Sequence, residues 1–324
     1  MIKRIRKYFI LSVVALLATS CLDKYPEDAM LADEAINTVD DANLAVIGIY
    51  DAFKSSSLYS GYLTLLPDLQ ADFVYAVNGY SNIYGDIWRW NDIHPTNEQV
   101  ESVYGALYGV INRCNFLLDN VEKVKSSIKT DEEYDRLDQY CGEAYFARAL
   151  AYSELVKMFC KPYESDEEAA NELGVVLTEH YKGDEPIVRA SLKDSYQFIL
   201  EDLDRAAELL ALDKNYNPST DGALFNSAIY FNEYTVYALR ARVALYMRKW
   251  DEAIKYSSKV IDSDYFLLSS CTKNISSGVS YYKYMWTNDL ATEVIFKVGF
   301  TVNSYGGALG QIFFNYDYST FRPD

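Results

Sequence analysis

The sequence predicts a mainly α-helical fold, in which a helical repeat scaffold carries long irregular loops and a little β structure. Three observations support this prediction. Glycine and proline number only 15 and 7 among 324 residues, which favours long helices over turn-rich β architecture. Apolar residues recur at spacings of three and four over most of residues 36–265. Residues 226–262 show the clearest pattern, which predicts two helices folded back on each other.

The hairpin of residues 226–262 resembles a tetratricopeptide repeat, in which small residues let two helices approach closely. Its first helix has one narrow face, formed by Ala238, Ala241, Ala244 and Leu245. Its second helix has an inward face formed by Ala253, Ile254, Ser257, Val260 and Ile261. Trp250 stands at the turn, where we expect it to pack in the core. One hairpin cannot bury its own apolar face, so neighbouring helices must stack against it.

The other helices are predicted from capping signals, taken in chain order. These signals are Thr38 with Asp41, Thr96 with Gln99, Thr130 with Glu133, and Ser191, each followed by an apolar stripe. Pro162 ends the long helix that begins after Thr130. Residues 55–93 lose this periodicity and form a loop insertion, far longer than the usual connection of about 4–6 residues. Beyond residue 265 the helical pattern stops, and Glu293–Phe300 alternates like a short strand.

The first 20 residues have the pattern of a secretory signal peptide, with a basic start, an apolar run and then small residues. The apolar run is too short to span a bilayer. Cys21 follows in a sequence that resembles a bacterial lipobox, so we expect Cys21 to be lipidated and residues 21–35 to form a polar tether. The formal net charge of −17 argues against a nucleic-acid partner, because an acidic surface repels phosphate.

The sequence contains no set of residues with recognisable catalytic spacing, and we expect neither a metal site nor a cofactor. There are only 2 histidines, and pairs of adjacent acids carry little information in a chain with 47 Asp and Glu residues. Within the long helix, Glu143 and Arg148 are expected to form a structural pair. Buried free thiols are expected at the remaining cysteines, which are Cys114, Cys141, Cys160 and Cys271.

Several stretches, taken together and in order, resemble the SusD/RagB family of outer-membrane nutrient-binding lipoproteins. They are Cys21–Asp28, Val46–Tyr50, Tyr108–Leu118, Gly142–Tyr152, Arg189–Leu192, Asp202–Ala206, Ala238–Tyr246, Trp250–Ile254 and Glu293–Phe296. The resemblance implies a non-catalytic protein, lipid-anchored in the outer membrane and exposed at the cell surface. Such a protein captures oligosaccharides, or peptides in some members, and delivers them to a SusC-like TonB-dependent transporter. It further implies that residues 36–265 are the tetratricopeptide-like half, and that residues 266–324 begin a loop-rich C-terminal region that is incomplete.

The aromatic loops are the expected glycan-binding surface, because sugar rings stack on aromatic rings while their hydroxyls hydrogen-bond to carboxylates and amides. We expect Trp88 and Trp90 to share one side of an extended segment, with Trp286 and Tyr282 as the opposite wall. The other expected contacts are Tyr80, Tyr84, Asp72, Asn78, Arg89 and Asn91. Alternatively, the tryptophans anchor the loops onto the helices.

Two other functions remain open at this point. A secreted helical enzyme that degrades glycans would release products from its substrate, which a pure binding protein does not do. A structural or adhesin-like lipoprotein would have no soluble ligand.

Overall fold

The computed structural model describes residues 34–77, 79, 83–91, 93–183, 187–211, 228–288, 293–300, 308–315, 318–319 and 321–323. The chain divides into two units, Met1–Ile36 and Asn37–Asp324, and every helix and strand named below belongs to the second unit. The predicted signal peptide and Cys21 lie outside the described residues.

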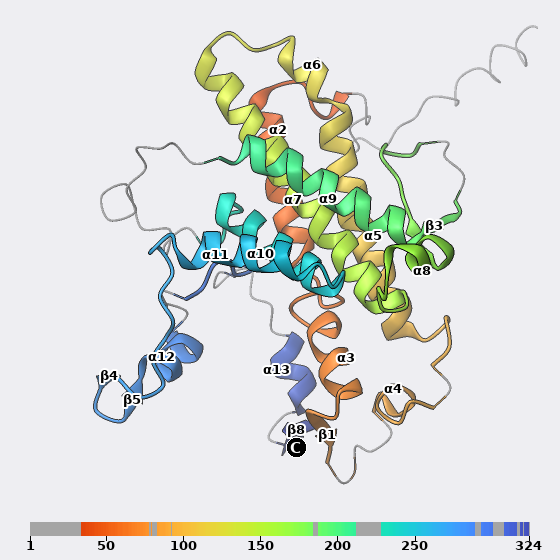
Figure 1. The fold of residues 1–324 in the computed structure, drawn as a ribbon, viewed down its shortest axis with the longest axis vertical. Coiled ribbons are helices and arrows are strands. Elements are labelled where there is room, and N and C mark those ends of the chain that lie inside the picture. The colour runs from red at the N-terminus through yellow and green to blue at the C-terminus, as the bar shows by residue number, and fades with distance from the viewer. Residues whose placement is uncertain are drawn as a thin grey trace, which may run out of the picture. The chain divides into compact units, whose positions relative to one another are not determined.

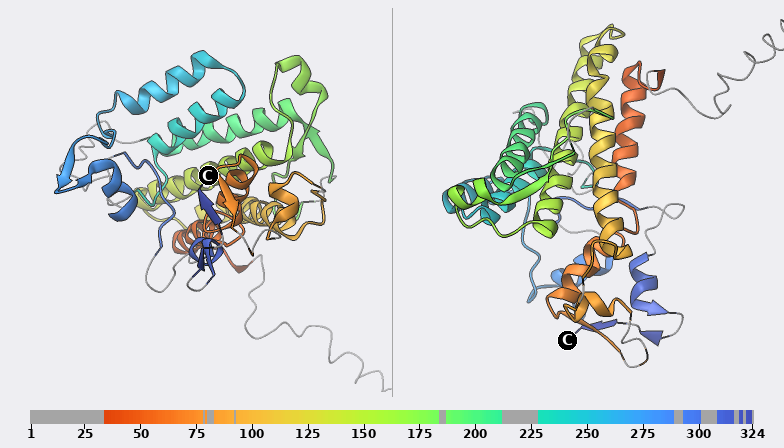
Figure 2. Two further views of the ribbon diagram at one scale, coloured as in Figure 1. Left: turned by 90° about the horizontal axis from the view of Figure 1, so that it is seen from below. Right: turned by 90° about the vertical axis from the view of Figure 1, so that its right-hand side faces the viewer.

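Long helices packed one against the next form the scaffold of the second unit (Figure 1). They are α2 (Val39–Ala52), α5 (Glu98–Asp119), α7 (Asp131–Phe159), α9 (Leu192–Leu209), α10 (Glu233–Tyr246) and α11 (Trp250–Ile261). Figure 2 shows α2, α5 and α7 side by side, and the packing continues from α7 to α9, then α10 and α11. The prediction of a mainly α-helical fold is therefore confirmed.

Shorter helices and two-stranded antiparallel sheets connect and extend this scaffold. The short helices are α3 (Tyr62–Gln70), α4 (Gly85–Trp88), α6 (Val121–Lys125), α8 (Asp166–Asn171), α12 (Tyr281–Asn288) and α13 (Ala308–Phe313). The strand pairs are β1 (Val74–Ala76) with β8 (Phe321–Pro323), β2 (Leu173–Val176) with β3 (Arg189–Ser191), β4 (Asn274–Ser276) with β5 (Val279–Ser280), and β6 (Phe314–Asn315) with β7 (Tyr318–Ser319). The pairing of β1 with β8 joins the early loop insertion to the far end of the chain.

Local capping decides where most of the long helices begin. Thr38 and Thr130 each form a complete capping box, with Asp41 and Glu133 respectively, and both predictions are confirmed. Ser191 caps α9 as predicted. The predicted box of Thr96 with Gln99 is wrong, because the side-chain oxygen of Asn97 accepts hydrogen bonds from the backbone N–H groups of Gln99 and Val100. The helix therefore begins one residue later than predicted.

The buried side chains Arg148 and Glu143 of α7 each have hydrogen-bond partners on other helices. The guanidinium of Arg148 is buried, and its Nε and Nη2 each donate at 2.8 Å to the carboxylate of Asp202 on α9. Its Nη1 donates at 2.7 Å to Asn115 Oδ1 on α5. Glu143 instead accepts from Tyr50 Oη at 2.7 Å. The predicted pair of Glu143 with Arg148 is wrong, because residues five apart on a helix point to different sides.

The hairpin predicted over residues 226–262 is confirmed as α10 packed on α11, but much of its predicted inward face is exposed. Trp250 is 57% exposed, so its predicted place in the core is wrong. Ile254 and Ile261 are 64% and 68% exposed, whereas Val260 is buried. Among the described elements, α11 packs mainly on α10, so its outer side has no stacked neighbour that would bury these residues.

Two predictions about irregular regions need correction. The insertion of residues 55–93 contains a helix, α3, which the sequence hides because Pro67 lies inside it. Its side chains Leu63, Leu65, Leu66 and Leu69 are buried. Glu293–Phe300 is not a strand, although the backbone N–H of Lys297 donates to Ala228 O at 2.8 Å. A single such bond makes no ladder, so the alternation of the sequence finds no partner strand.

The four described cysteines are free thiols, as predicted. Cys114 and Cys141 are buried, and burial raises the pKa of each to about 12. The expected burial is only partial at Cys160 and is wrong at Cys271, which is exposed on the loop after the last scaffold helix.

Candidate functional site

Six of the predicted glycan-binding residues lie in the turn between α3 and β1 or on and beside α4. We call this group the loop cluster, and it consists of Asp72, Tyr84, Trp88, Arg89, Trp90 and Asn91. Asn78 and Tyr80 were predicted to belong to it and lie outside the described residues. Figure 1 shows α3, β1 and α4 together at one end of the unit, beside β8.

Trp90 is the most exposed aromatic ring of the loop cluster, at 66%. Its indole Nε1 donates a hydrogen bond to Gln70 O, the carbonyl of the last residue of α3, at 3.1 Å. The edge of the ring is therefore fixed to a helix while most of the ring surface faces water. A flat apolar surface held in one orientation suits ligand stacking, because little conformational entropy is lost when a ligand binds.

Trp88 and Arg89 form a second part of the loop cluster. The guanidinium carbon of Arg89 lies 4.5 Å from the centre of the Trp88 ring, which is a cation–π contact. The indole Nε1 of Trp88 is buried and has no hydrogen-bond partner among the described residues. A buried donor of this kind requires an explanation, and a polar ligand or an ordered water would satisfy it.

Trp88 and Trp90 do not share one side of an extended segment, so that part of the sequence-based interpretation is wrong. Trp88 is the last residue of α4, and Trp90 has a left-handed backbone with φ of 52°. The alternation of a strand does not apply to two residues at the end of a helical turn. Their indole groups accordingly have different surroundings, one half-buried under Arg89 and the other open to water.

Tyr84 holds the loop cluster to the rest of the fold. Its ring stacks on Phe321 of β8 with ring centres 5.9 Å apart and an angle of 8°, and it meets Tyr62 of α3 edge-on at 5.8 Å. Burial raises the pKa of the Tyr84 hydroxyl well above its ordinary value, and the hydrogen bond with Tyr62 adds to this effect. The hydroxyl is therefore a neutral hydrogen-bonding group at any physiological pH.

Backbone strain is concentrated in the loop cluster. Asp72, Tyr84 and Trp90 have φ values of 59°, 54° and 52°, in the left-handed region that non-glycine residues rarely adopt. Such conformations carry a free-energy cost and occur often where a site must hold a particular shape. Three of the predicted binding residues thus share a property that the sequence did not reveal.

Two exposed aromatic side chains near the loop cluster were missed in the sequence. Phe73 and Tyr75 are 67% and 46% exposed, whereas Val74 between them is buried. They follow the turn after α3, whose last residue anchors Trp90. The alternation of exposed and buried side chains at the start of β1 was the signal that could have found them.

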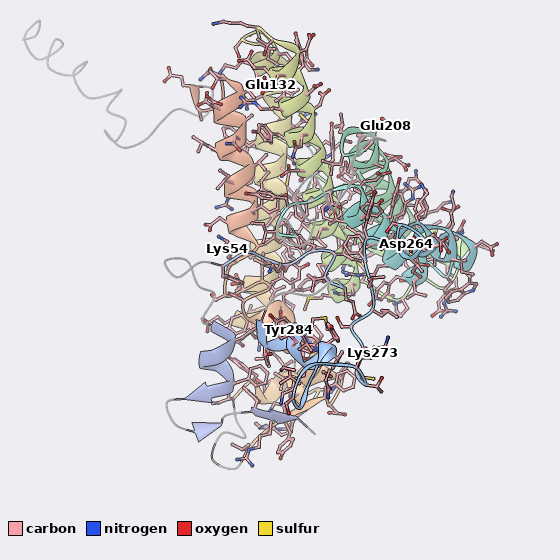
Figure 3. The ribbon with its side chains drawn as sticks, turned by 90° about the vertical axis from the view of Figure 1, so that its left-hand side faces the viewer. Lys54, Glu132, Glu208, Asp264, Lys273 and Tyr284 are labelled. Atoms are coloured by element: carbon pink, nitrogen blue, oxygen red, sulfur yellow. The ribbon has the colours of Figure 1, made fainter. Side chains whose placement is uncertain are left out.

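Trp286 and Tyr282 form a separate aromatic pair on α12. Their rings meet edge-on with centres 6.2 Å apart, and the side chains are 72% and 48% exposed. Tyr284 and Lys273, labelled in Figure 3, mark this segment, in which α12 packs on the β4–β5 hairpin. Figures 1 and 2 show α12 and α4 on opposite sides of the unit. Contrary to the prediction from the sequence, Trp286 and Tyr282 therefore do not face Trp88 and Trp90 across one binding site.

The described residues of the loop cluster supply hydrogen-bonding and stacking groups. Within the described ranges, no group of three or more His, Cys, Asp or Glu side chains is arranged to hold a metal ion. Across the same ranges, no helix combines the length and hydropathy that crossing a membrane requires. Asp72, Arg89 and Asn91 are exposed and can exchange hydrogen bonds with a polar ligand.

Comparison with known proteins gives one consistent match. The SusD-like family model described as "Starch-binding associating with outer membrane" matches residues 22–245. Two SusD-like proteins of Formosa agariphila are 28% and 23% identical over 150 and 158 residues, which are 43% and 48% of this chain. These matches span only 27% and 30% of the length of those two relatives.

Solved structures show the same fold. A SusD superfamily protein from Bacteroides thetaiotaomicron has a TM-score of 0.70 at 21% identity, covering 88% of this chain and 59% of that one. A protein described as a putative sugar binding protein, from Bacteroides vulgatus, has a TM-score of 0.67 at 25% identity, covering 84% and 57%. The chain thus spans less than two thirds of the length of the structures that it resembles.

Proposed function

Because the chain belongs to the SusD-like family, whose model is described as starch-binding and associated with the outer membrane, we propose that it binds an oligosaccharide without transforming it. The bound sugar is then passed to a SusC-like TonB-dependent transporter in the same membrane. Lipidation at Cys21, directly after a signal peptide, would hold the protein at the cell surface.

The single observation that supports this site best is the Trp90 ring, exposed over 66% of its side chain and anchored to Gln70 O. One face of a pyranose is lined by C–H groups, which pack on an indole ring, while its hydroxyls extend sideways. Asp72, Arg89 and Asn91 are exposed on the neighbouring turns, which supports hydrogen bonding between their side chains and those hydroxyls. The guanidinium of Arg89, which lies 4.5 Å from the centre of the Trp88 ring, would supply a further hydrogen-bond donor.

Trp90→Ala tests the site. This substitution removes the stacking surface, and because the position is exposed, the packing of α3 and α4 should stay intact. We expect the Kd for a polysaccharide to rise at least tenfold, which is a loss of about 1.4 kcal/mol in binding free energy. Affinity electrophoresis against a panel of neutral polysaccharides finds the ligand, and titration calorimetry measures the Kd. Circular dichroism verifies that the helical content is unchanged.

Trp286→Ala is the matched control, because it removes an equally exposed indole from α12. We expect it to leave the Kd near that of the wild type. Loss of affinity in the Trp286 variant alone would move the site to α12 and overturn the proposal. Product release from the panel would instead indicate a glycan-degrading enzyme, and binding without co-purification of a β-barrel transporter would argue against delivery to such a partner.

A further inference from the structure

A hollow lies between the C-terminal end of α7 and the turn that joins α10 to α11. Its volume is about 650 Å³, within the range of about 300–1,000 Å³ that is usual for small-ligand sites. Its described lining includes four aromatic and four cationic side chains and no carboxylate. We call it the cationic hollow.

The aromatic residues of the cationic hollow have two roles. Tyr163 and Tyr196 are buried and meet edge-on with ring centres 5.1 Å apart, so they form a rigid base. Tyr246 and Trp250 are 48% and 57% exposed and stand at its opening. Trp250, at the turn of the helical hairpin, thus presents an aromatic surface to solvent beside a preformed cavity.

Among the described residues, the four cations that line the cationic hollow pair with only three carboxylates. Lys157 and Arg242 both pair with one carboxylate, that of Glu154, which is buried. The Arg242 Nη1 lies 3.8 Å from Glu154 Oε1, and the Arg242 side chain is 54% exposed. Two cations therefore share one anion, in a chain whose net charge is −17. An anionic group that enters the hollow would meet an Arg242 guanidinium whose existing ion pair is long and solvated.

The other two cations are each paired once, Lys161 with Glu172 at 2.8 Å and Arg248 with Glu164 at 2.6 Å. Arg248 occupies the turn after α10 with φ of 58°, a conformation in which glycine is the least strained residue. The backbone of that turn therefore does not favour arginine. The side chain of Arg248 lines the cationic hollow.

We propose that the cationic hollow is a second binding site, for an acidic saccharide whose pyranose units carry carboxylate or sulfate groups. The sugar ring stacks on Trp250, and the anionic substituent pairs with Arg242. This site goes beyond the proposed capture of an oligosaccharide at the loop cluster, and it uses none of the same residues. The two sites are thus separable by substitution.

Titration calorimetry with defined oligosaccharides of equal length tests the second site. The probes are an oligogalacturonate, which carries carboxylates, a sulfated galactan fragment, and a neutral galactan fragment. In the full chain we expect one or both anionic probes to bind, and their Kd to rise with ionic strength because salt screens exposed charge pairs. Trp250→Ala and Arg242→Gln should each raise the Kd of the anionic probe at least tenfold.

Lys125→Gln is the matched control for charge, because Lys125 is a surface cation on α6 that pairs with Glu122 at 2.8 Å. It should leave the Kd of the anionic probe unchanged. Absence of binding by both anionic probes would overturn the proposal, as would binding of the neutral fragment that Trp250→Ala and Arg242→Gln weaken by the same factor as binding of the anionic probes. The Trp250 and Arg242 variants could instead keep their saccharide affinity and lose co-purification of a transporter. That result would overturn the proposal and show that the cationic hollow contacts a protein rather than a saccharide.

Discussion

Glu143 provides a pH-dependent test of the packing inside the scaffold. Its side chain is only 3% exposed, near the middle of α7. It accepts hydrogen bonds from Tyr50 Oη at 2.7 Å and from Gln139 Nε2 at 3.0 Å. Tyr50 Oη in turn accepts from the backbone N–H of Phe231 at 2.8 Å, so this carboxyl lies where α2, α7 and the segment before α10 meet.

Burial raises the pKa of Glu143 from its ordinary value of 4.5 to about 7, although its two hydrogen bonds act in the opposite direction. The folded protein therefore keeps a proton that the unfolded chain releases near pH 4.5. The stability that this proton supplies is fully present below pH 4.5 and is lost as the pH rises through about 7. At about 1.4 kcal/mol for each pKa unit, a rise from 4.5 to about 7 corresponds to a loss of roughly 3.5 kcal/mol above pH 7.

Glu143→Gln removes this dependence, because glutamine is neutral at every pH and its carbonyl can still accept from Tyr50 Oη. We expect the variant to exceed the wild type by about 1–3 kcal/mol in free energy of unfolding at pH 8, and to lose most of this advantage at pH 4.5. Urea denaturation followed by circular dichroism at the two pH values measures the difference. Glu101→Gln, at an exposed position on α5, is the control and should change stability little at either pH. An advantage of the same size at pH 4.5 and pH 8 would refute the reasoning.

Two further outcomes test the scaffold. Asp202→Asn leaves the buried Arg148 guanidinium without a charged partner, so we expect the free energy of unfolding to fall by about 3–5 kcal/mol and the Tm to be clearly lower. The double variant Arg148→Met with Asp202→Leu removes both charges and should recover much of this lost stability. If the single and the double variant have the same free energy of unfolding, the buried unpaired charge of Arg148 is not what destabilises the single variant. Thr130→Ala removes the N-cap of α7 and should lower the free energy of unfolding, measured by urea denaturation, by about 1 kcal/mol. Thr130→Ser keeps a capping hydroxyl and should be as stable as the wild type. An alanine variant as stable as the wild type would mean that the cap contributes nothing to stability.

Helix identity and several helix starts were predictable from the sequence because they depend on neighbouring residues. The hydrogen bonds of a capping box join side chains and backbone groups only three residues apart, as at Thr38 and Thr130. The family resemblance was visible for a related reason, since it rests on short stretches in a fixed order. Where a competing cap stood one residue away, as with Asn97 beside Thr96, even this local prediction failed.

The candidate site was predictable only in part. The sequence identified the aromatic and polar residues of the insertion, and Trp90 among them is exposed as a binding residue must be. Its anchor at Gln70 is twenty residues away, and Tyr84 stacks on Phe321 from the far end of the chain. The left-handed backbone at Asp72, Tyr84 and Trp90 was likewise not predicted from the sequence.

By itself, then, the sequence determined the mainly helical fold, most of the helix boundaries that capping controls, and the family. Only the tertiary structure decided which side chains meet and which face water. Trp250 is exposed because no described element stacks on the outer side of α11, and Arg148 pairs with Asp202 because α9 lies against α7. Helix formation depends on atoms within about four residues of each other, whereas exposure and pairing depend on neighbours that only the folded chain brings together.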